Sequence, residues 1–349
     1  MSPWLIARTP TQARVIKILG WVIVAGVIFY LPLHFDLVRV LQFNKVAYFG
    51  LAALGLGLLT GFNGQISLGH GAFFGIGAYT TAILVTDHHW PHLLTLVAAF
   101  AITFVVGAIV GLPALRIHGL YLALVTLALA TVFPILVQRY RSFTGGSQGK
   151  NVPKFTAPDW TGLENDQWQY YVTVGVVVIG FVLVRNLVKS RSGRALIAIR
   201  DHEVAAEVLG VNLAVYKVLA FGVSAALAGV AGGLFVFSES FVSSRSFALA
   251  LSITLLAAMV LGGVATIVGP AIGAFFIVFT PEVSDAISER IAWVEGDQLS
   301  LAVFGSLLIV AMLVAPDGAL GLLRRGRALL IRLVHRPPTP EPGPSVAAE

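Results

Sequence analysis

The feature that most constrains this chain is a series of long apolar runs separated by short polar segments. A run of about 20 apolar residues is long enough to cross the hydrocarbon core of a bilayer as a helix, and roughly ten such runs can be recognised. The composition agrees, because 57% of the 349 residues are hydrophobic and only 11% are charged. The sequence therefore predicts an all-α polytopic integral membrane protein with about 8–10 transmembrane helices.

The runs divide the chain into a short leader, a membrane domain and a tail. We expect a leader at 1–14, a transmembrane domain at 15–323, and a tail at 324–349 that is basic and then Pro-rich. The first run is interpreted as an uncleaved anchor, and the 247–283 region as two spans or one span with a re-entrant piece. The predicted spans are about 15–33, 46–60, 66–86, 92–115, 119–138, 169–188, 215–238, 247–265, 266–283 and 300–315.

Charge predicts the orientation of these runs. If there are ten spans, most of the Lys and Arg residues fall on the side of both termini and of the 189–214 loop, whereas most Asp and Glu residues fall on the other side. Because a Lys/Arg excess marks the cytoplasmic side, we expect both termini and the 189–214 loop in the cytoplasm. The longest external loop is then 139–168. The net charge of +6 is explained by this bias, so nucleic acid is not an expected partner.

The stretch 190–217 is the one polar, helix-forming segment between two long apolar runs. Asp201 is a favourable N-cap, Glu203 and Glu207 suit the N-terminal half of a helix, and Gly210 with Asn212 is a plausible stop. This pattern predicts a helix of roughly two turns, which would need packing to hold its shape.

Apolar residues in this stretch suggest a surface for contact. Ile197, Val204, Val208 and Leu209 are expected near one face, and Ala205-Ala206 would allow another backbone to approach closely. The simpler alternative is an ordinary loop between two membrane helices.

The segment 61–79 is unusually rich in glycine and predicts a broken or closely packed helix. Gly69, Gly71 and Gly75 are candidates for helix packing. Polar groups within a span face protein or a water-filled path, so this segment and the 119–138 run offer candidates for a translocation path. These candidates are Asn63, Gln65, Ser67, His70 and Thr126.

The sequence offers little support for metal or catalytic chemistry. No second ligand stands at metal-binding spacing from His70, and Asp87 with His88, His89 and His92 fits a solvated loop better than a metal site. The run 145–151 resembles a phosphate-binding loop only faintly, since its spacing is wrong. Cysteine is absent, which excludes disulfides. We therefore predict no metal site, no cofactor in this chain and no enzyme activity of its own.

Several strings resemble branched-chain amino acid ABC transporter permeases of the LivM type, in the LivH/LivM family. The string Gly64 to Tyr79 is similar nearly residue for residue, and Ala205-Ala206 with Gly210 resembles the coupling loop of ABC importer permeases, with Val204 at the usual Glu position. The matching strings follow one another in the order that the family has, from about residue 46 to residue 323. Further matching strings lie at 119–128, 144–149, 262–273 and 315–318.

The resemblance implies a function and a set of partners. It implies the permease subunit of an importer in the cell inner membrane, working with a second homologous permease, two cytoplasmic ATPase subunits that carry ATP and Mg, and an external substrate-binding protein. The implied substrates are leucine, isoleucine and valine. The implied ATPase-coupling loop comprises Arg194, Arg200, Asp201, Glu203, Ala205, Ala206, Glu207 and Gly210.

Two other functions stay open. A urea or amide importer of the same family would show the same motifs. An ion-coupled secondary transporter is less favoured, because such proteins keep an ionisable group near the membrane midplane, and the one Asp or Glu inside a predicted span, Glu282, stands at the very end of 266–283.

Overall fold

The computed structural model describes residues 26, 29–117 and 119–288, and then 305–306, 309–310, 313 and 318–321. The predicted leader, most of the first predicted span, most of the span at 300–315 and the tail lie outside the described residues. Within the described part the chain is almost entirely helical, as predicted. The longer helices are α2 (Leu37–Gly57), α3 (His70–His88), α4 (His92–Gly111), α5 (Leu120–Arg139), α7 (Asn165–Lys189), α8 (Arg191–Asp201), α10 (Leu213–Glu239), α11 (Leu249–Gly262) and α12 (Gly269–Ser288).

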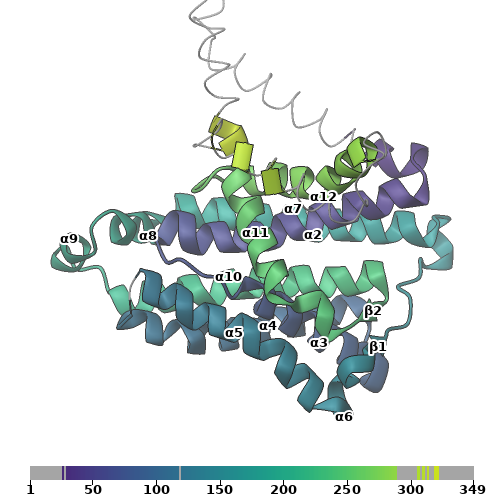
Figure 1. Cartoon of the computed structure of the whole chain (residues 1–349), viewed down its shortest axis with the longest axis horizontal. Coiled ribbons are helices and arrows are strands. Elements are labelled where there is room, and N and C mark those ends of the chain that lie inside the picture. The colour runs from purple at the N-terminus through teal and green to yellow at the C-terminus, as the bar shows by residue number, and fades with distance from the viewer. Residues whose placement is uncertain are drawn as a thin grey trace, which may run out of the picture.

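The short elements lie at the two ends of the bundle (Figure 1). One end carries α9 (Glu203–Val208), and we call it the α9 end. The opposite end carries α6 (Arg141–Thr144) and a two-stranded antiparallel pair, β1 (Lys150–Asn151) and β2 (Phe241–Val242), and we call it the hairpin end. The long helices run between these two ends.

Five of the described helices are long and apolar enough to cross a membrane. Residues 37–62, 92–115, 120–139, 165–189 and 213–239 form them, while α11 and the apolar part of α12 are shorter. The predicted spans at 247–265 and 266–283 therefore correspond to two short helices. An all-α polytopic membrane fold is confirmed.

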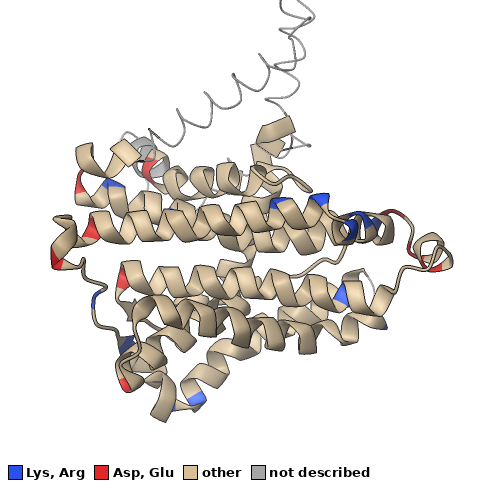
Figure 2. Ribbon diagram, turned by 180° about the vertical axis from the view of Figure 1, so that it is seen from behind, with Lys and Arg blue, Asp and Glu red and all other residues tan. Residues whose placement is uncertain are grey.

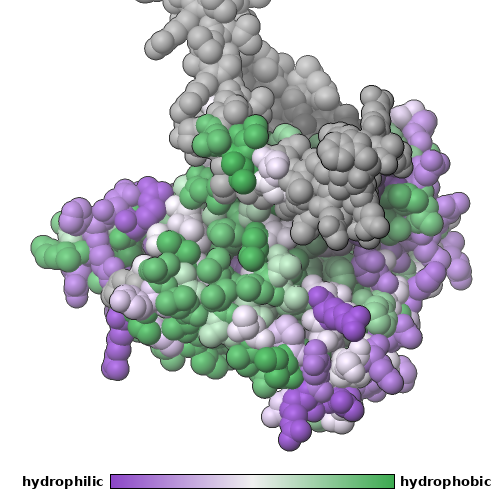
Figure 3. All heavy atoms as spheres, in the orientation of Figure 1, coloured by the Kyte–Doolittle hydropathy of each residue, from purple (hydrophilic) through white to green (hydrophobic). Residues whose placement is uncertain are grey.

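Charge is distributed along the bundle axis as the sequence predicts. Figure 2 shows Lys and Arg gathered near α8 at the α9 end, and several Asp and Glu residues at the hairpin end. Three ion pairs stand at the hairpin end: Lys150 with Asp87 at 2.6 Å, Arg39 with Glu282 at 2.7 Å, and Lys45 with Glu239 at 3.0 Å. Between the ends, the face seen in Figure 3 is broadly hydrophobic, which suits contact with lipid.

Helix α10 occupies the centre of the bundle, packed against α2, α3 and α4. Glycines make this close packing possible, because a side chain at several of them would overlap a neighbouring backbone. A Cβ at Gly77 would overlap the backbone of Gly229, and a Cβ at Gly232 would overlap the carbonyl of Phe74. Membrane helices often associate through such packing of small residues, because lipid provides no hydrophobic driving force between them.

The chain re-enters the bundle between α2 and α3. After α2, a π-helical turn (Leu58–Phe62) leads into a non-helical segment, Asn63–Gly69, which we call the re-entrant loop. Helix α3 begins only at His70, whose side chain meets Ser224 in the interior of α10. The prediction of a broken helix within 61–79 is thus confirmed.

A second interruption precedes α11. The chain leaves β2, passes through a 3₁₀ turn (Ser244–Phe247) and starts α11 inside the bundle, where Phe247 is fully buried against α3 and α5. Helix α11 then reaches the α9 end, where Ala265 lies against Gly61, and α12 returns along α2. Both breaks are only partly buried, because Gly64 and Ile66 in the first and Arg245 and Ser246 in the second are exposed.

We expect Gly77→Ala to destabilise the fold by about 1–3 kcal/mol, the usual cost of overpacking a tight core. The matched control is Gly175→Ala in α7, where an added Cβ would meet nothing within 4 Å. The control should be neutral or stabilise slightly, because Ala is the better helix former. Thermal unfolding of the detergent-solubilised protein measures both, and equal melting temperatures for the two variants would contradict this account of the α3–α10 contact.

Candidate functional site

His70 stands at the centre of a buried hydrogen-bond chain that links α2, α3 and α10. Its Nε2 lies 2.7 Å from the Ser224 hydroxyl, and that hydroxyl donates to the Gly55 carbonyl at 2.5 Å. Since the Ser224 proton is committed to Gly55, Nε2 must carry the proton that it donates to Ser224. In the neutral imidazole, Nδ1 then accepts from the Ser67 hydroxyl at 3.0 Å, and the ring serves as a bridge between helices.

Side chains of α5 and α11 bond the backbone of the re-entrant loop and of the first turn of α3. Thr126 accepts from the Leu68 N–H at 2.9 Å, and Ser252 accepts from the Gly71 N–H at 2.9 Å. A Cβ at Gly69 would lie 2.7 Å from the Thr126 carbonyl, and one at Gly71 would lie 2.7 Å from the Ser252 hydroxyl. Both glycines therefore lie in close contact with these neighbours.

Asn63 and Gln65 form an amide pair at the start of the loop. The Asn63 amide donates to Gln65 Oε1 at 2.9 Å, which leaves Asn63 Oδ1 and Gln65 Nε2 buried without a partner. A buried unpaired group costs about 1–3 kcal/mol. The pair therefore keeps one acceptor and one donor unused in this conformation. The role of these residues, and of Ser67, His70 and Thr126, in a translocation path stays a prediction.

Residues 190–212 differ in part from the sequence prediction. An amphipathic helix, α8, precedes the short one; Ser190 caps it by accepting from the Gly193 N–H, and Leu196 and Ile199 face the bundle. Asp201 is the last residue of α8, so its prediction as the N-cap of the short helix is wrong, and His202 takes that place.

The reason for that difference is local. Asp201 has a helical backbone at the end of α8, whereas an N-cap residue has a non-helical one, and His202 has that extended backbone. Gly210 ends α9 with a positive φ of 84°, as predicted. Asn212 instead begins the next helix, because its side chain accepts from the Val215 N–H.

Arg200 joins α8 to the end of α2. Its guanidinium donates to the Gly61 carbonyl at 2.9 Å, at the π-helical turn. Gly64, at a positive φ of 75°, lies so close that a Cβ there would be 3.0 Å from Arg200 Cγ. Arg194 is exposed, and its guanidinium donates to the Lys189 carbonyl at 3.4 Å. One arginine thus connects the polar segment directly to the entrance of the re-entrant loop.

Helix α9 presents a small apolar surface at the tip of the bundle. Val204, Val208 and Leu209 are 69%, 82% and 83% exposed, and Ala205 is exposed beside them. Ala206 is buried against the chain itself, so only one of the two alanines is available for contact. Ile197 lies on α8, partly buried, and does not share this surface as the sequence suggested.

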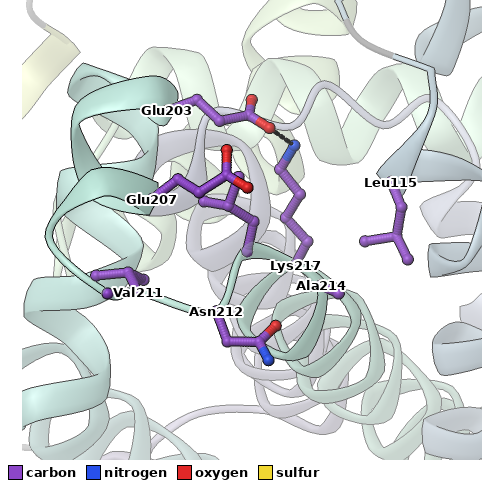
Figure 4. Close-up of a pocket in the computed structure, with 9 residues that line it drawn as sticks. Leu115, Glu203, Glu207, Val211, Asn212, Ala214 and Lys217 are labelled. Atoms are coloured by element: carbon purple, nitrogen blue, oxygen red, sulfur yellow. Dashed lines mark hydrogen bonds and ion pairs between the residues drawn. The ribbon is translucent and has the colours of Figure 1, made fainter.

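Two neighbouring pockets lie where α8, α9 and α10 meet. Lys217, only 3% exposed, forms an ion pair with Glu203, and both residues line both pockets. The larger, which we call the α9 pocket, has a volume of about 490 Å³, and Figure 4 shows Glu207 close to the Glu203–Lys217 pair. The smaller, the loop pocket, has a volume of about 150 Å³ and is lined by residues of the re-entrant loop, α8 and the 114–122 segment.

The Gly-rich string at 145–149 has a structural role at the hairpin end. Gly145, Gly146 and Gly149 adopt positive φ angles, and the tight turn brings Lys150 opposite Val242 in the strand pair. Lys150 then reaches Asp87 rather than a phosphate. The turn therefore ties the 139–168 loop to α3 and α10.

Comparison with known proteins gives a consistent result. The profile of the family described as "Branched-chain amino acid transport system / permease component" matches residues 40–312. The permease protein LivM of the high-affinity branched-chain amino acid transport system of Escherichia coli is 31% identical, over 78% of this chain and 68% of that protein.

Two further relatives belong to systems of the same description. LivH of Escherichia coli is 27% identical over 80% of this chain and 94% of its own length. BraD of Pseudomonas aeruginosa is 28% identical over 78% of this chain and 91% of its own length. No solved structure matches this chain.

The His70 bridge can be tested with Ser224→Ala. The variant leaves the imidazole N–H without an acceptor in a buried place, so we expect a loss of about 1–3 kcal/mol of stability. Ser246→Ala, at an exposed serine, should change the melting temperature little. Thermal unfolding in detergent compares the two, and a Ser224→Ala protein as stable as the control would show that the bridge does not hold the helices.

Proposed function

Because this chain belongs to the family of branched-chain amino acid transport permease components, we propose that it is the membrane-spanning permease subunit of an ABC importer. In this function it provides the path for leucine, isoleucine and valine, which an external binding protein delivers and partner ATPase subunits drive. The observation that carries the proposal is the family match over residues 40–312, which includes the re-entrant loop and the segment with α8 and α9.

The distribution of charge supports an orientation for the subunit. Lys and Arg are concentrated around α8, so we place the α9 end, and with it both termini, in the cytoplasm. The hairpin end would then face the external binding protein. A second homologous permease and two ATPase subunits complete the assembly, and ATP and Mg bind to the ATPase subunits rather than to this chain.

The exposed surface of α9 suits the coupling role. Val204, Val208 and Leu209 form a compact apolar tip that water would otherwise cover, and an apolar groove on an ATPase subunit would bury it. Helix α8 anchors this tip to the bundle through Leu196 and Ile199. Displacement of α9 would therefore also move α8.

Arg200 supports a route from α9 to the membrane interior. It ends α8 next to Asp201 and also holds the Gly61 carbonyl, so a shift of α8 pulls on the π-helical turn and on the loop that follows. The loop carries Ser67 and leads into His70. An inward-open state would exchange the bond of the Leu68 N–H to Thr126 and the bond of His70 to Ser224 for bonds to water or substrate.

The coupling role predicts the effect of Val208→Glu. A charge at the centre of the apolar tip should weaken ATPase attachment at least tenfold, because burying an unpaired carboxylate is costly. The measurement is co-purification of the ATPase subunits with the tagged permease. Phe143→Glu, at an exposed aromatic residue of the hairpin end, is the control and should retain full attachment. Equal recovery of ATPase from both variants would refute docking through α9.

The substrate is tested by energised uptake in cells that contain the partner subunits, with and without this chain. We expect uptake of labelled leucine to be lost without it, while uptake of labelled urea stays unchanged. Loss of urea uptake alone would instead identify a urea importer of the same family.

A further inference from the structure

The loop pocket combines features that suit a small zwitterion. Its polar lining comes from the Asn63–Gln65 amide pair and from the charged residues Arg200, Glu203 and Lys217. Its remaining wall is apolar and includes Ile117, Leu122 and Ile199. Binding sites for small molecules typically have this character, with mostly apolar walls and a few convergent polar groups.

The size of the pocket limits what it can hold. Its volume of about 150 Å³ is well below the roughly 300–1,000 Å³ that is usual for sites of drug-sized ligands. A nucleotide or a peptide is therefore too large, whereas a few water molecules or a single amino acid would fit.

The charged residues around the loop pocket narrow the choice of ligand further. Cationic Arg200 and Lys217 and anionic Glu203 lie around one small space, so a ligand with both a carboxylate and an ammonium group meets a partner for each. The amide pair holds a further donor, Gln65 Nε2, and a further acceptor, Asn63 Oδ1, both buried without a partner, and a rotation of either side chain would turn them toward a ligand. A branched aliphatic side chain would face Ile117, Leu122 and Ile199.

We propose that the loop pocket is a binding site for an α-amino acid with an apolar side chain at the α9 end of the permease. The proposal rests on the proposed function, because it gives that pocket to the transported amino acid on the cytoplasmic side. Since the re-entrant loop and α8 both line the pocket, a bound amino acid bridges them and holds Arg200 and Gln65 together. Bound product therefore opposes the movement of α8 away from the loop.

The direct test is equilibrium binding of labelled leucine to the permease complex in nanodiscs, without binding protein and without ATP. We expect saturable binding with competition by valine. Three competitors each lack one feature of leucine: 4-methylpentanoate lacks the ammonium group, 3-methylbutylamine lacks the carboxylate, and glycine lacks the side chain. Each should compete at least about tenfold less well than valine, because an unmatched polar group or an empty apolar wall weakens binding.

Two variants test whether leucine binds in the loop pocket. Gln65→Leu removes the free amide donor at nearly constant size, and Ile117→Phe fills the apolar side. Each should weaken leucine binding at least about tenfold. The matched control is Gln148→Leu, at an exposed glutamine of the hairpin end, which should bind leucine as the unaltered complex does. Elution of the intact complex at its normal position in gel filtration shows that each variant is assembled.

The outcomes separate this proposal from the proposed function. If the unaltered complex imports leucine with binding protein and ATP but binds none without them, the pocket holds water only, and this proposal fails while the importer function stands. Leucine binding that both pocket variants retain would place the site elsewhere and overturn the proposal. A complex that neither imports nor binds leucine overturns both.

Discussion

The structure depends on one constraint: in a bilayer, every backbone polar group must find its partner within the protein. The re-entrant loop breaks the helical hydrogen bonding inside the bundle, and side chains of other helices replace what is lost. Thr126 accepts from the Leu68 N–H, and Ser252 accepts from the Gly71 N–H, while Thr60 donates to the Gln65 carbonyl. A loop held by hydroxyl groups can exchange these hydrogen bonds for others.

Close packing around α10 makes those replacements possible. Gly77 against Gly229 and Gly232 against Phe74 bring α3 and α10 near enough for His70 to reach Ser224. The buried hydrogen bond between His70 and Ser224 thus depends on glycines that have no side chain to take part in it. At the α9 end the same bundle fixes Arg200 beside Gly61, so the polar segment and the re-entrant loop form one connected unit.

Several features were predictable because they depend on local composition. The break within 61–79 follows from its density of glycine, and the stop at Gly210 follows from the left-handed backbone that glycine adopts readily. The prediction failed at Asp201, because α8 continues through that residue and the extended backbone that a cap needs comes at His202. Helix α8 was missed as a separate element, although Leu196 and Ile199 at helical spacing after Ser190 were a usable signal.

The sequence by itself determined that the chain is a helical membrane protein, which parts of it are polar, and which family motifs it resembles. These properties follow from the length and hydrophobicity of each run and from short strings of residues. Only the tertiary structure decided that His70 is a neutral bridge to Ser224, that Ala205 is exposed while Ala206 is buried, and that Lys217 pairs with Glu203. Those outcomes depend on how distant helices rotate and approach one another, and packing between side chains far apart in the sequence sets that geometry.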